Sequence, residues 1–308
     1  MTGPLVHARG LVKRFGDFTA VDGIDVEVQR GEAFGFLGPN GAGKSSTMRM
    51  IGCVSPPSGG ELSVLGMDPL RDGTRIRARL GVCPQLDNLD IELSVLENLT
   101  TYARFFGISR KVARARATEL LEFVQLGERA DSKVDPLSGG MKRRLTIARA
   151  LINEPDMVLL DEPTTGLDPQ ARHLVWERLF RLKRQGVTLV LTTHYMGEAE
   201  QLCDRLVVMD AGRIVAEGSP RDLIERYSTR EVVELRFDVE SQDVFAGKLA
   251  GVGERVEVLP DRILLYVQDG DAATAEVARR ALNPSSVLVR RSSLEDVFLH
   301  LTGRTLVD

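Results

Sequence analysis

The sequence of 308 residues has few cysteines and no apolar run that could cross a bilayer. A membrane-spanning helix needs about 20 apolar residues, whereas the longest apolar runs here, DMVLLDE and VTLVLTTH, have the length of strands. The N-terminal MTGPLVHARGLVKRFG carries charges where a signal peptide needs an apolar core. These absences favour a cytoplasmic protein, which leaves docking on a membrane protein open.

Only three cysteines occur, Cys53, Cys83 and Cys203, and none forms a CxxC pair. This argues against a disulfide framework and a zinc site and favours packing in the core. The formal net charge is −4, so bulk electrostatics do not favour a nucleic-acid partner. The length is enough for two domains of about 150 residues each.

The first part of the chain, about residues 1–225, alternates short apolar strands with helical patterns. Such alternation predicts an α/β fold with a mostly parallel sheet covered by helices. Strands are expected at 32–38, 79–85, 156–163 and 187–194, helices at 44–53, 94–108 and 111–127, and a hairpin at 205–218.

The pattern changes in residues 226–308, which we expect to form a second domain. Strands are expected at 231–239, 254–260, 262–269 and 286–292, and helices at 243–251 and 271–282. The order βαββαβ predicts a small ferredoxin-like α+β fold.

The segment GPNGAGKS (38–45) matches the phosphate-loop pattern G-x-x-x-x-G-K-[ST]. Its glycines let backbone amides turn onto phosphate oxygens, and the following helix directs its positive end at the same anion. Lys44 would reach the β- and γ-phosphates, and the Ser45 hydroxyl would ligate Mg²⁺. The expected ATP-binding residues are Gly38, Pro39, Asn40, Gly41, Ala42, Gly43, Lys44, Ser45 and Ser46.

Two carboxylates, Asp161 and Glu162, follow the apolar run MVLL. A buried strand seldom ends in paired acids without a cation or a reaction to serve. Asp161 is therefore expected to hold Mg²⁺, and Glu162 to activate a water for attack on the γ-phosphate. The alternative, two solvated acids at a strand end, is weak beside a phosphate loop.

The segment LSGGMKRRLTIARAL (137–151) is the most specific motif. With GPNGAGKS, LLDEPTTGLDP and LTTH in the same order and spacing, it resembles the ATP-binding cassette (ABC) transporter ATPases over about residues 5–225. The resemblance implies a P-loop NTPase domain with a helical insert at about 86–150. Met141, in place of the commoner glutamine, followed by KRRL, resembles a branch that serves drug, lipid and lipo-oligosaccharide exporters.

Ser138, Gly139 and Gly140 stand where a helix begins and would form a second anion site. Two phosphate-recognising loops with a single lysine-bearing loop suggest that one ATP bridges two subunits. The resemblance implies this head-to-tail homodimer, with ATP between the phosphate loop of one subunit and the LSGGM segment (137–141), the family signature, of the other.

Four further positions take roles from the resemblance alone. Phe15 matches the aromatic residue that stacks on adenine, with core packing as the alternative. Gln85 matches the glutamine that senses Mg²⁺ and contacts the membrane partner. Asp168 matches the loop that crosses the dimer interface, and His194 matches the histidine that contacts the γ-phosphate.

The function implied is ATP hydrolysis by the subunit that powers an exporter, peripheral on the inner face of the cell membrane. A separate integral-membrane permease of the ABC-2 type would carry the cargo. GVCPQLDNLDIELSVLENL resembles nodulation-factor exporter ATPases and, less closely, antibiotic-resistance exporter ATPases. An importer ATPase, and a soluble ABC protein without a transport role, remain the alternatives.

The chain ends in SSLEDVFLHLTGRTLVD (292–308), which predicts an amphipathic helix. Leu294, Val297, Phe298 and Leu301 form one apolar stripe. Ser292 or Ser293 would cap its start, and Gly303 would end it. The segment LEDVFLHLTG resembles the C-terminal ending of ATPases in the drug- and lipid-exporter branch. A helix that packs within its own domain and an interface with another domain both remain open.

Overall fold

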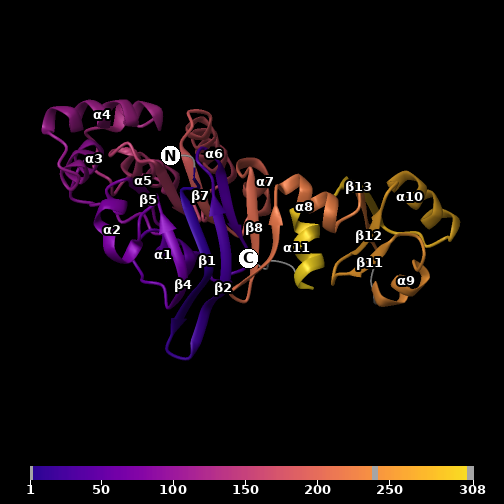
Figure 1. The fold of residues 1–308 in the computed structure, drawn as a ribbon. Helices are drawn as coiled ribbons and strands as arrows, with labels where there is room; N and C mark the ends of the chain where they lie inside the picture. The colour runs from indigo at the N-terminus through magenta and orange to yellow at the C-terminus, as the bar shows by residue number, and fades with distance from the viewer. Residues whose placement is uncertain (1–2, 238–241, 304–308) are drawn as a thin grey trace. The chain divides into compact units, whose positions relative to one another are not determined.

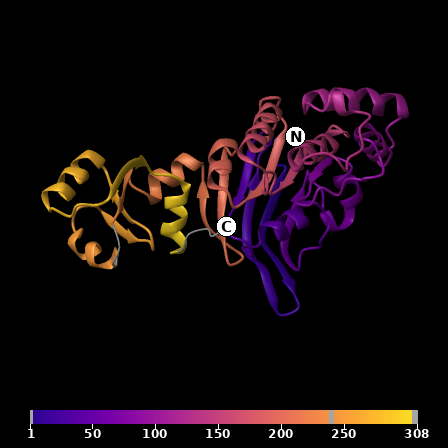
Figure 2. The same cartoon turned by 180° about the vertical axis from the view of Figure 1, so that it is seen from behind.

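The computed structural model describes residues 3–237 and 242–303. The chain divides into two compact units, Met1–Ser219 and Pro220–Asp308 (Figures 1 and 2). The predicted boundary after residue 225 therefore falls inside α8 (Pro220–Tyr227), which contacts α11 (Leu294–Thr302) of the second unit. Within the described ranges no helix combines the length and apolar character of a membrane span.

The first unit contains a six-stranded sheet in the order β5-β6-β7-β3-β8-β9. Its strands are β3 (Ala33–Leu37), β5 (Leu80–Cys83), β6 (Met157–Asp161), β7 (Thr188–Thr193), β8 (Arg205–Asp210) and β9 (Arg213–Gly218). All pairs are parallel except β8 with β9, which form the predicted hairpin. The predicted α/β class is confirmed, since apolar strands such as β3 and β7 are buried on both faces.

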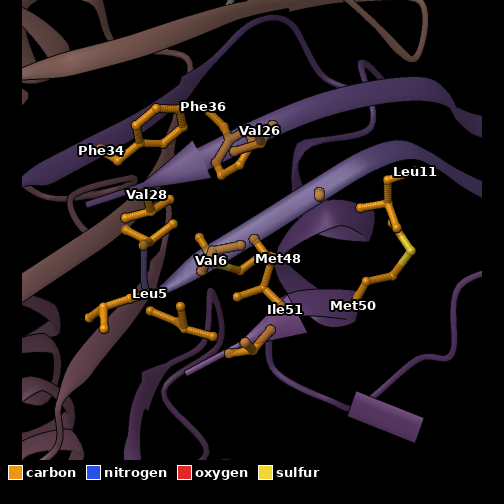
Figure 3. Close-up of a cluster of buried hydrophobic side chains, with 14 of the residues drawn as sticks. Leu5, Val6, Leu11, Val26, Val28, Phe34, Phe36, Met48, Met50 and Ile51 are labelled. Carbon is orange, nitrogen blue, oxygen red and sulfur yellow. The ribbon is translucent and has the colours of Figure 1, made fainter. Parts of the chain in front are cut away.

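A second sheet in the first unit is antiparallel, in the order β2-β1-β4. Its strands are β1 (Val6–Phe15), β2 (Phe18–Val28) and β4 (Gly59–Val64). The sequence did not predict this sheet. It packs over β3 and α1 (Lys44–Ile51) through a cluster of buried side chains shown in Figure 3, among them Val6, Leu11, Val26, Val28, Phe34, Phe36, Met48, Met50 and Ile51.

The helical insert lies in the first unit between β5 and β6. Its helices are α3 (Val95–Arg104), α4 (Arg110–Phe123) and α5 (Gly139–Leu151), with a 3₁₀ turn at Gly127–Arg129. They share a buried cluster of their own, and α3 and α4 lie side by side in Figure 1. The remaining helices of the unit are α2 (Pro69–Arg77), α6 (Pro169–Arg184) and α7 (Met196–Leu202).

The second unit is built on one antiparallel sheet in the order β11-β12-β10-β13. Its elements are β10 (Glu231–Arg236), α9 (Gln242–Lys248), β11 (Arg255–Val258), β12 (Ile263–Val267), α10 (Gly270–Arg279) and β13 (Ser286–Arg291). The order βαββαβ and the sheet order confirm the predicted ferredoxin-like fold. Residues 238 and 239 of the predicted first strand lie outside the described residues.

Both faces of this sheet are covered. Val233 and Leu265 point into a cluster with α9 and α10, whereas their neighbours Val232 and Tyr266 cluster with Leu299 of α11. This follows from the period of two along a strand. Figures 1 and 2 show α11 on one side of the sheet and α10 on the other.

The C-terminal helix begins at the predicted cap, Ser293, and ends at Gly303, whose φ of 67° is left-handed. Leu294, Val297 and Phe298 are buried as expected. Leu301 is only half-buried, and the end of the predicted segment, 304–308, lies outside the described residues. The helix packs within its own unit, and an additional role as an interface stays a prediction.

Candidate functional site

The phosphate loop joins β3 to α1, and its glycines are required by the local geometry. Gly41 and Gly43 have φ of 82° and 99°, which disfavour any residue with a Cβ. A Cβ at Gly38 would collide with the carbonyl oxygen of Met209, and one at Gly43 with that of Ala20. The strand–loop–helix context expected for a phosphate loop is therefore present.

A cavity of about 210 Å³ lies against this loop. Its wall is formed by residues 40–46 together with Phe18, Ala20, Gln85 and Glu162. Most of the predicted nucleotide-binding loop therefore shares one cavity with Gln85 and Glu162, which lie far away in the sequence.

Lys44 lies at the first position of α1 and is almost fully buried. Its Nζ donates to the carbonyl oxygens of Gly38 at 2.7 Å and Pro39 at 3.0 Å, and lies 3.9 Å from Glu162 Oε1. Burial lowers the pKa of Lys44, while the carboxylates of Glu162 and Asp161 act in the opposite direction. A cation with several oxygen neighbours thus stands at the base of the loop.

Asp161 ends β6 and is tied to both neighbouring elements. Ser45 Oγ donates to Asp161 Oδ1 at 3.0 Å, and Thr192 Oγ1 donates to the same oxygen at 2.5 Å. Thr192 is its direct partner on the adjacent parallel strand β7. The Ser45 hydroxyl, the Asp161 carboxylate and the Gln85 amide oxygen are hard oxygen donors, the ligand type that suits Mg²⁺.

Glu162 is buried, with 6% of its surface exposed, and is the residue on which the site converges. Gln85 Nε2 donates to its Oε2 at 3.0 Å, and Thr165 Oγ1 donates to the same oxygen at 3.1 Å. His194 Nδ1 lies 3.3 Å from Oε1, although the contact lacks the geometry of a hydrogen bond. The sequence-predicted Lys44, Gln85, Glu162 and His194 are therefore brought together.

The charge and backbone of Glu162 are both unusual. The contact with His194 is the main reason that the pKa of Glu162 lies below its usual range; burial opposes the shift, and Lys44 and Thr165 add to it. Its φ of 47° is left-handed, a conformation that costs a residue other than glycine about 1–3 kcal/mol. Such strain concentrates at functional sites.

The signature residues lie outside this cavity. Ser138 caps α5 by accepting a hydrogen bond from the Met141 amide at 3.3 Å, and Gly139 and Gly140 form the first turn. The α5 start thus has the geometry of an anion site at a helix N-terminus.

Asp168 also caps a helix, by accepting from the Ala171 amide at 2.9 Å at the start of α6. A Cβ on Gly140 would lie 2.7 Å from Ala171 Cβ. The signature glycine and the Asp168 cap are therefore close neighbours, although both are separate from the cavity.

Phe15 is half-exposed at the end of β1 and does not line the cavity. Phe18, paired with it across the β1–β2 turn, does line it. Phe18 was missed because the resemblance assigned the adenine-stacking role to Phe15, although both aromatics occur in KRFGDF. The contacts of Thr192 and Thr165 were also missed, because they depend on which strands are neighbours.

Comparison with known proteins finds a separate family match in each of the two units. Residues 21–165 match the family described as ABC transporter, and residues 242–303 match the family described as Nodulation factor export protein NodI, C-terminal domain. The chain is 47% identical over 304 residues to the Nod factor export ATP-binding protein I of Cupriavidus pinatubonensis, covering 99% of this chain and 92% of that protein. The Burkholderia pseudomallei protein of that name is 49% identical over 296 residues, 96% of each chain.

Solved structures agree with the first unit. A dimeric post-hydrolysis ATP-binding cassette bound to ADP and Pi matches with a TM-score of 0.64 and 30% identity, over 70% of this chain and 98% of that chain. A Clostridium perfringens protein that is part of an ABC transporter complex matches with a TM-score of 0.67 and 28% identity, over 72% and 91%.

Proposed function

This chain belongs to the ABC transporter family of ATP-binding proteins, and from that premise we propose that it hydrolyses ATP to power an exporter. The observation that carries the proposal is the convergence of Lys44, Ser45 and Glu162 on the wall of the phosphate-loop cavity, with Asp161 hydrogen-bonded to Ser45. The export role is supported by the relatives that match almost the whole chain.

ATP binds with its phosphates on the loop amides and on Lys44, whose ammonium exchanges its contacts with the carbonyl oxygens of Gly38 and Pro39 for phosphate oxygens. Ser45, Gln85 and Asp161 would hold Mg²⁺, which when bound would supply charge neutralisation for the phosphates. Either Phe15 or Phe18 supplies the adenine-facing ring; the position of Phe18 on the cavity wall supports the latter.

Glu162 acts as the general base. Its lowered pKa keeps it ionised near neutral pH, so it can accept a proton from the water that attacks the γ-phosphorus. Lys44 stabilises the charge that develops on the transferring phosphoryl group, which leaves as phosphate while ADP remains. His194, in contact with Glu162, orients the γ-phosphate and its attacking water.

A homodimer completes each site. Ser138, Gly139 and Gly140 of one subunit bind the γ-phosphate of ATP held by the other subunit, and Asp168 lies at the shared interface. Two facts support this assembly: the position of Ser138, Gly139 and Gly140 at the start of α5, and the dimeric state described for the cassette at 30% identity.

A separate ABC-2 type permease is the membrane partner, and the chain is peripheral on the inner face of the membrane. A second cavity of about 290 Å³ borders Gln85 and is lined by apolar side chains that include Val54 and Leu86, which are 72% and 74% exposed. Such exposed apolar residues around a cavity favour a partner helix. The start of the helical insert is therefore the proposed docking region.

The names of the relatives favour a lipo-oligosaccharide of the Nod-factor class as cargo, with drugs and lipids as the wider class. An importer ATPase is disfavoured, because importer cassettes often carry a small C-terminal β-barrel. The second unit here has an open four-stranded sheet instead.

The test of the catalytic assignment is Glu162→Gln, which keeps the shape of the side chain but removes the base. We expect phosphate release to fall about 100- to 10,000-fold, with ATP binding retained and a stable dimer in size-exclusion chromatography with ATP and Mg²⁺. Glu119→Gln, on the exposed surface of α4, is the matched control and should turn over as the wild type does. Turnover of Glu162→Gln close to that of the control would refute Glu162 as the base.

A further inference from the structure

One buried arginine outside the motif roles already described joins three parts of the first unit. Arg143 lies in α5, and its side chain is 5% exposed. Its Nε donates to the carbonyl oxygen of Pro163 at 2.8 Å, and its Nη2 donates to those of Asp161 at 2.9 Å and Glu162 at 3.1 Å. A single guanidinium therefore binds three consecutive carbonyl groups around the proposed base.

The other end of the same guanidinium binds the segment that carries Gln85. Nη1 donates to the carbonyl oxygen of Pro84 at 2.5 Å and lies 3.4 Å from both the Gln85 carbonyl oxygen and Asp87 Oδ1. Arginine offers five N–H donors in a fixed plane. Arg143 uses donors on all three nitrogens, and so links α5 to two loops that are 58 and 19 residues away in sequence.

The contacts to Asp161 and Glu162 explain how the backbone of Glu162 keeps its left-handed φ of 47°. These two carbonyl groups belong to the two peptide planes that meet at the Glu162 Cα. In an extended strand, successive carbonyl groups point to opposite sides. Here both converge on Nη2 of Arg143, which requires a sharp turn of the chain between them.

We propose that Arg143 is a positioning residue that fixes the proposed base and the Gln85 segment to the signature helix as one body. This rests on the proposed function. In the head-to-tail dimer, Ser138 at the start of α5 binds the ATP held by the partner subunit. A shift of α5 on that ATP then moves Glu162 of its own subunit, so the two ATP sites of the dimer become coupled.

The neighbouring Arg144 provides a matched control, because it makes the same kind of contact elsewhere. Its Nη1 donates to the carbonyl oxygens of Val124 at 2.7 Å and Gln125 at 3.4 Å, at the end of α4. Arg144→Lys therefore removes an arginine–carbonyl fork from the same helix without touching the proposed base. It controls for the general effect of weakening α5.

The experiment compares wild type, Arg143→Lys, Arg143→Gln and Arg144→Lys as purified full-length chains. Phosphate release is measured against ATP concentration at fixed Mg²⁺, and ATP affinity is measured in the Glu162→Gln background, where nucleotide is not consumed. For both Arg143 variants we expect kcat to fall about 10- to 100-fold, as for a misplaced catalytic group. ATP affinity should stay within about 2-fold, and the Hill coefficient should fall from nearly 2 to about 1. Lysine should not rescue, because it lacks the planar fork.

Arg144→Lys should keep the kcat and Hill coefficient of the wild type within about 2-fold. A folded Arg143→Lys or Arg143→Gln with the kcat and Hill coefficient of the control would overturn the proposal and leave the ATPase function intact. So would a wild-type Hill coefficient of about 1, or loss of folding in both Arg143 variants, which would assign the residue to stability alone. A wild type that releases no phosphate would refute the proposed function itself, and this inference with it.

Discussion

The ion pair that holds the C-terminal helix to its sheet gives a prediction with a defined size. Asp296 is 1% exposed and accepts two hydrogen bonds from Arg290, at 2.7 and 2.9 Å. It also accepts one from the Ser293 amide at 2.8 Å, which caps α11. Asp296→Asn keeps an oxygen for the cap but removes the charge that faces the guanidinium. Breaking a buried pair costs about 3–5 kcal/mol, and Arg290 is 26% exposed, so we expect a loss of about 2–3 kcal/mol.

Hydrogen–deuterium exchange of the full-length chain measures this loss of stability at α11 itself, since opening of the helix exposes its amides. A cost of 2–3 kcal/mol corresponds to roughly 30- to 150-fold faster exchange in Leu294–Thr302. Asp261→Asn is the control. Asp261 is 56% exposed, and its pairs with Arg236 and Arg262 are 3.5 and 3.6 Å long, so its loss should change exchange by no more than about 2-fold. Equal exchange of α11 in the two variants would refute the reasoning.

The same pair predicts the response of α11 to acid. Burial alone would raise the pKa of Asp296, but the hydrogen bonds from Arg290 and from the Ser293 amide outweigh burial and hold the pKa below its usual range. A carboxyl whose pKa is lowered on folding stabilises fully above its unfolded pKa of about 3.9 and loses that contribution as pH falls through the folded value. Protection of α11, corrected for intrinsic exchange rates, should therefore be constant from pH 7 to about 5 and fall below about pH 4. Loss of protection already at pH 6 would contradict this.

Two further predictions concern the first unit. Gly81→Ala would place a Cβ against the carbonyl oxygen of Ala150 and should lower the free energy of unfolding by about 1–3 kcal/mol. In Gly197→Ala the new Cβ meets no atom within 4 Å, so the free energy of unfolding should rise by about 0.4–1 kcal/mol. Urea unfolding, followed by the fluorescence of the single tryptophan, distinguishes the two outcomes. Thr192→Val removes the hydrogen bond to Asp161 and should raise the Mg²⁺ concentration for half-maximal ATPase activity about 10- to 100-fold; an unchanged Mg²⁺ requirement would contradict a metal role for Asp161.

Features set by local sequence could be predicted well. The phosphate loop depends on glycine positions and on the strand and helix beside it, so the spacing of Gly41, Gly43 and Lys44 was enough to predict a loop between a strand and a helix. The second unit could also be predicted, because its strands keep a period of two, with Val232 and Val233 on opposite faces. In both cases the information lies within a few neighbouring residues.

Contacts across the sheet could not be predicted in this way. Thr192 reaches Asp161 because β6 and β7 are adjacent in register, and nothing in either strand's own sequence specifies that neighbour. The β1–β2–β4 sheet was missed for a related reason, since β1 and β2 contain several register shifts that blur their alternation. Arg143 appeared only within KRRL, as part of the resemblance to the exporter branch, and nothing in that segment indicates which arginine is buried.

The strained backbone of Glu162 explains why the loss of one of these long-range contacts should lower kcat while the protein remains folded. Proline disfavours compact backbone at the residue before it, and Glu162 precedes Pro163 with φ at 47°. Its amide donates to the Thr192 carbonyl at 3.1 Å and to Oγ1 at 3.0 Å, and its carbonyl accepts from Arg143 at 3.1 Å. At about 0.5–1.5 kcal/mol each, these bonds are of the same size as the 1–3 kcal/mol of strain. Loss of one is then enough to let Glu162 relax toward an extended backbone, while the sheet that carries it stays folded. Substitutions at Thr192 or Arg143 should therefore lower kcat at denaturant concentrations where the tryptophan signal is still that of the native protein, and a parallel loss of both signals would show that the strain is not held locally.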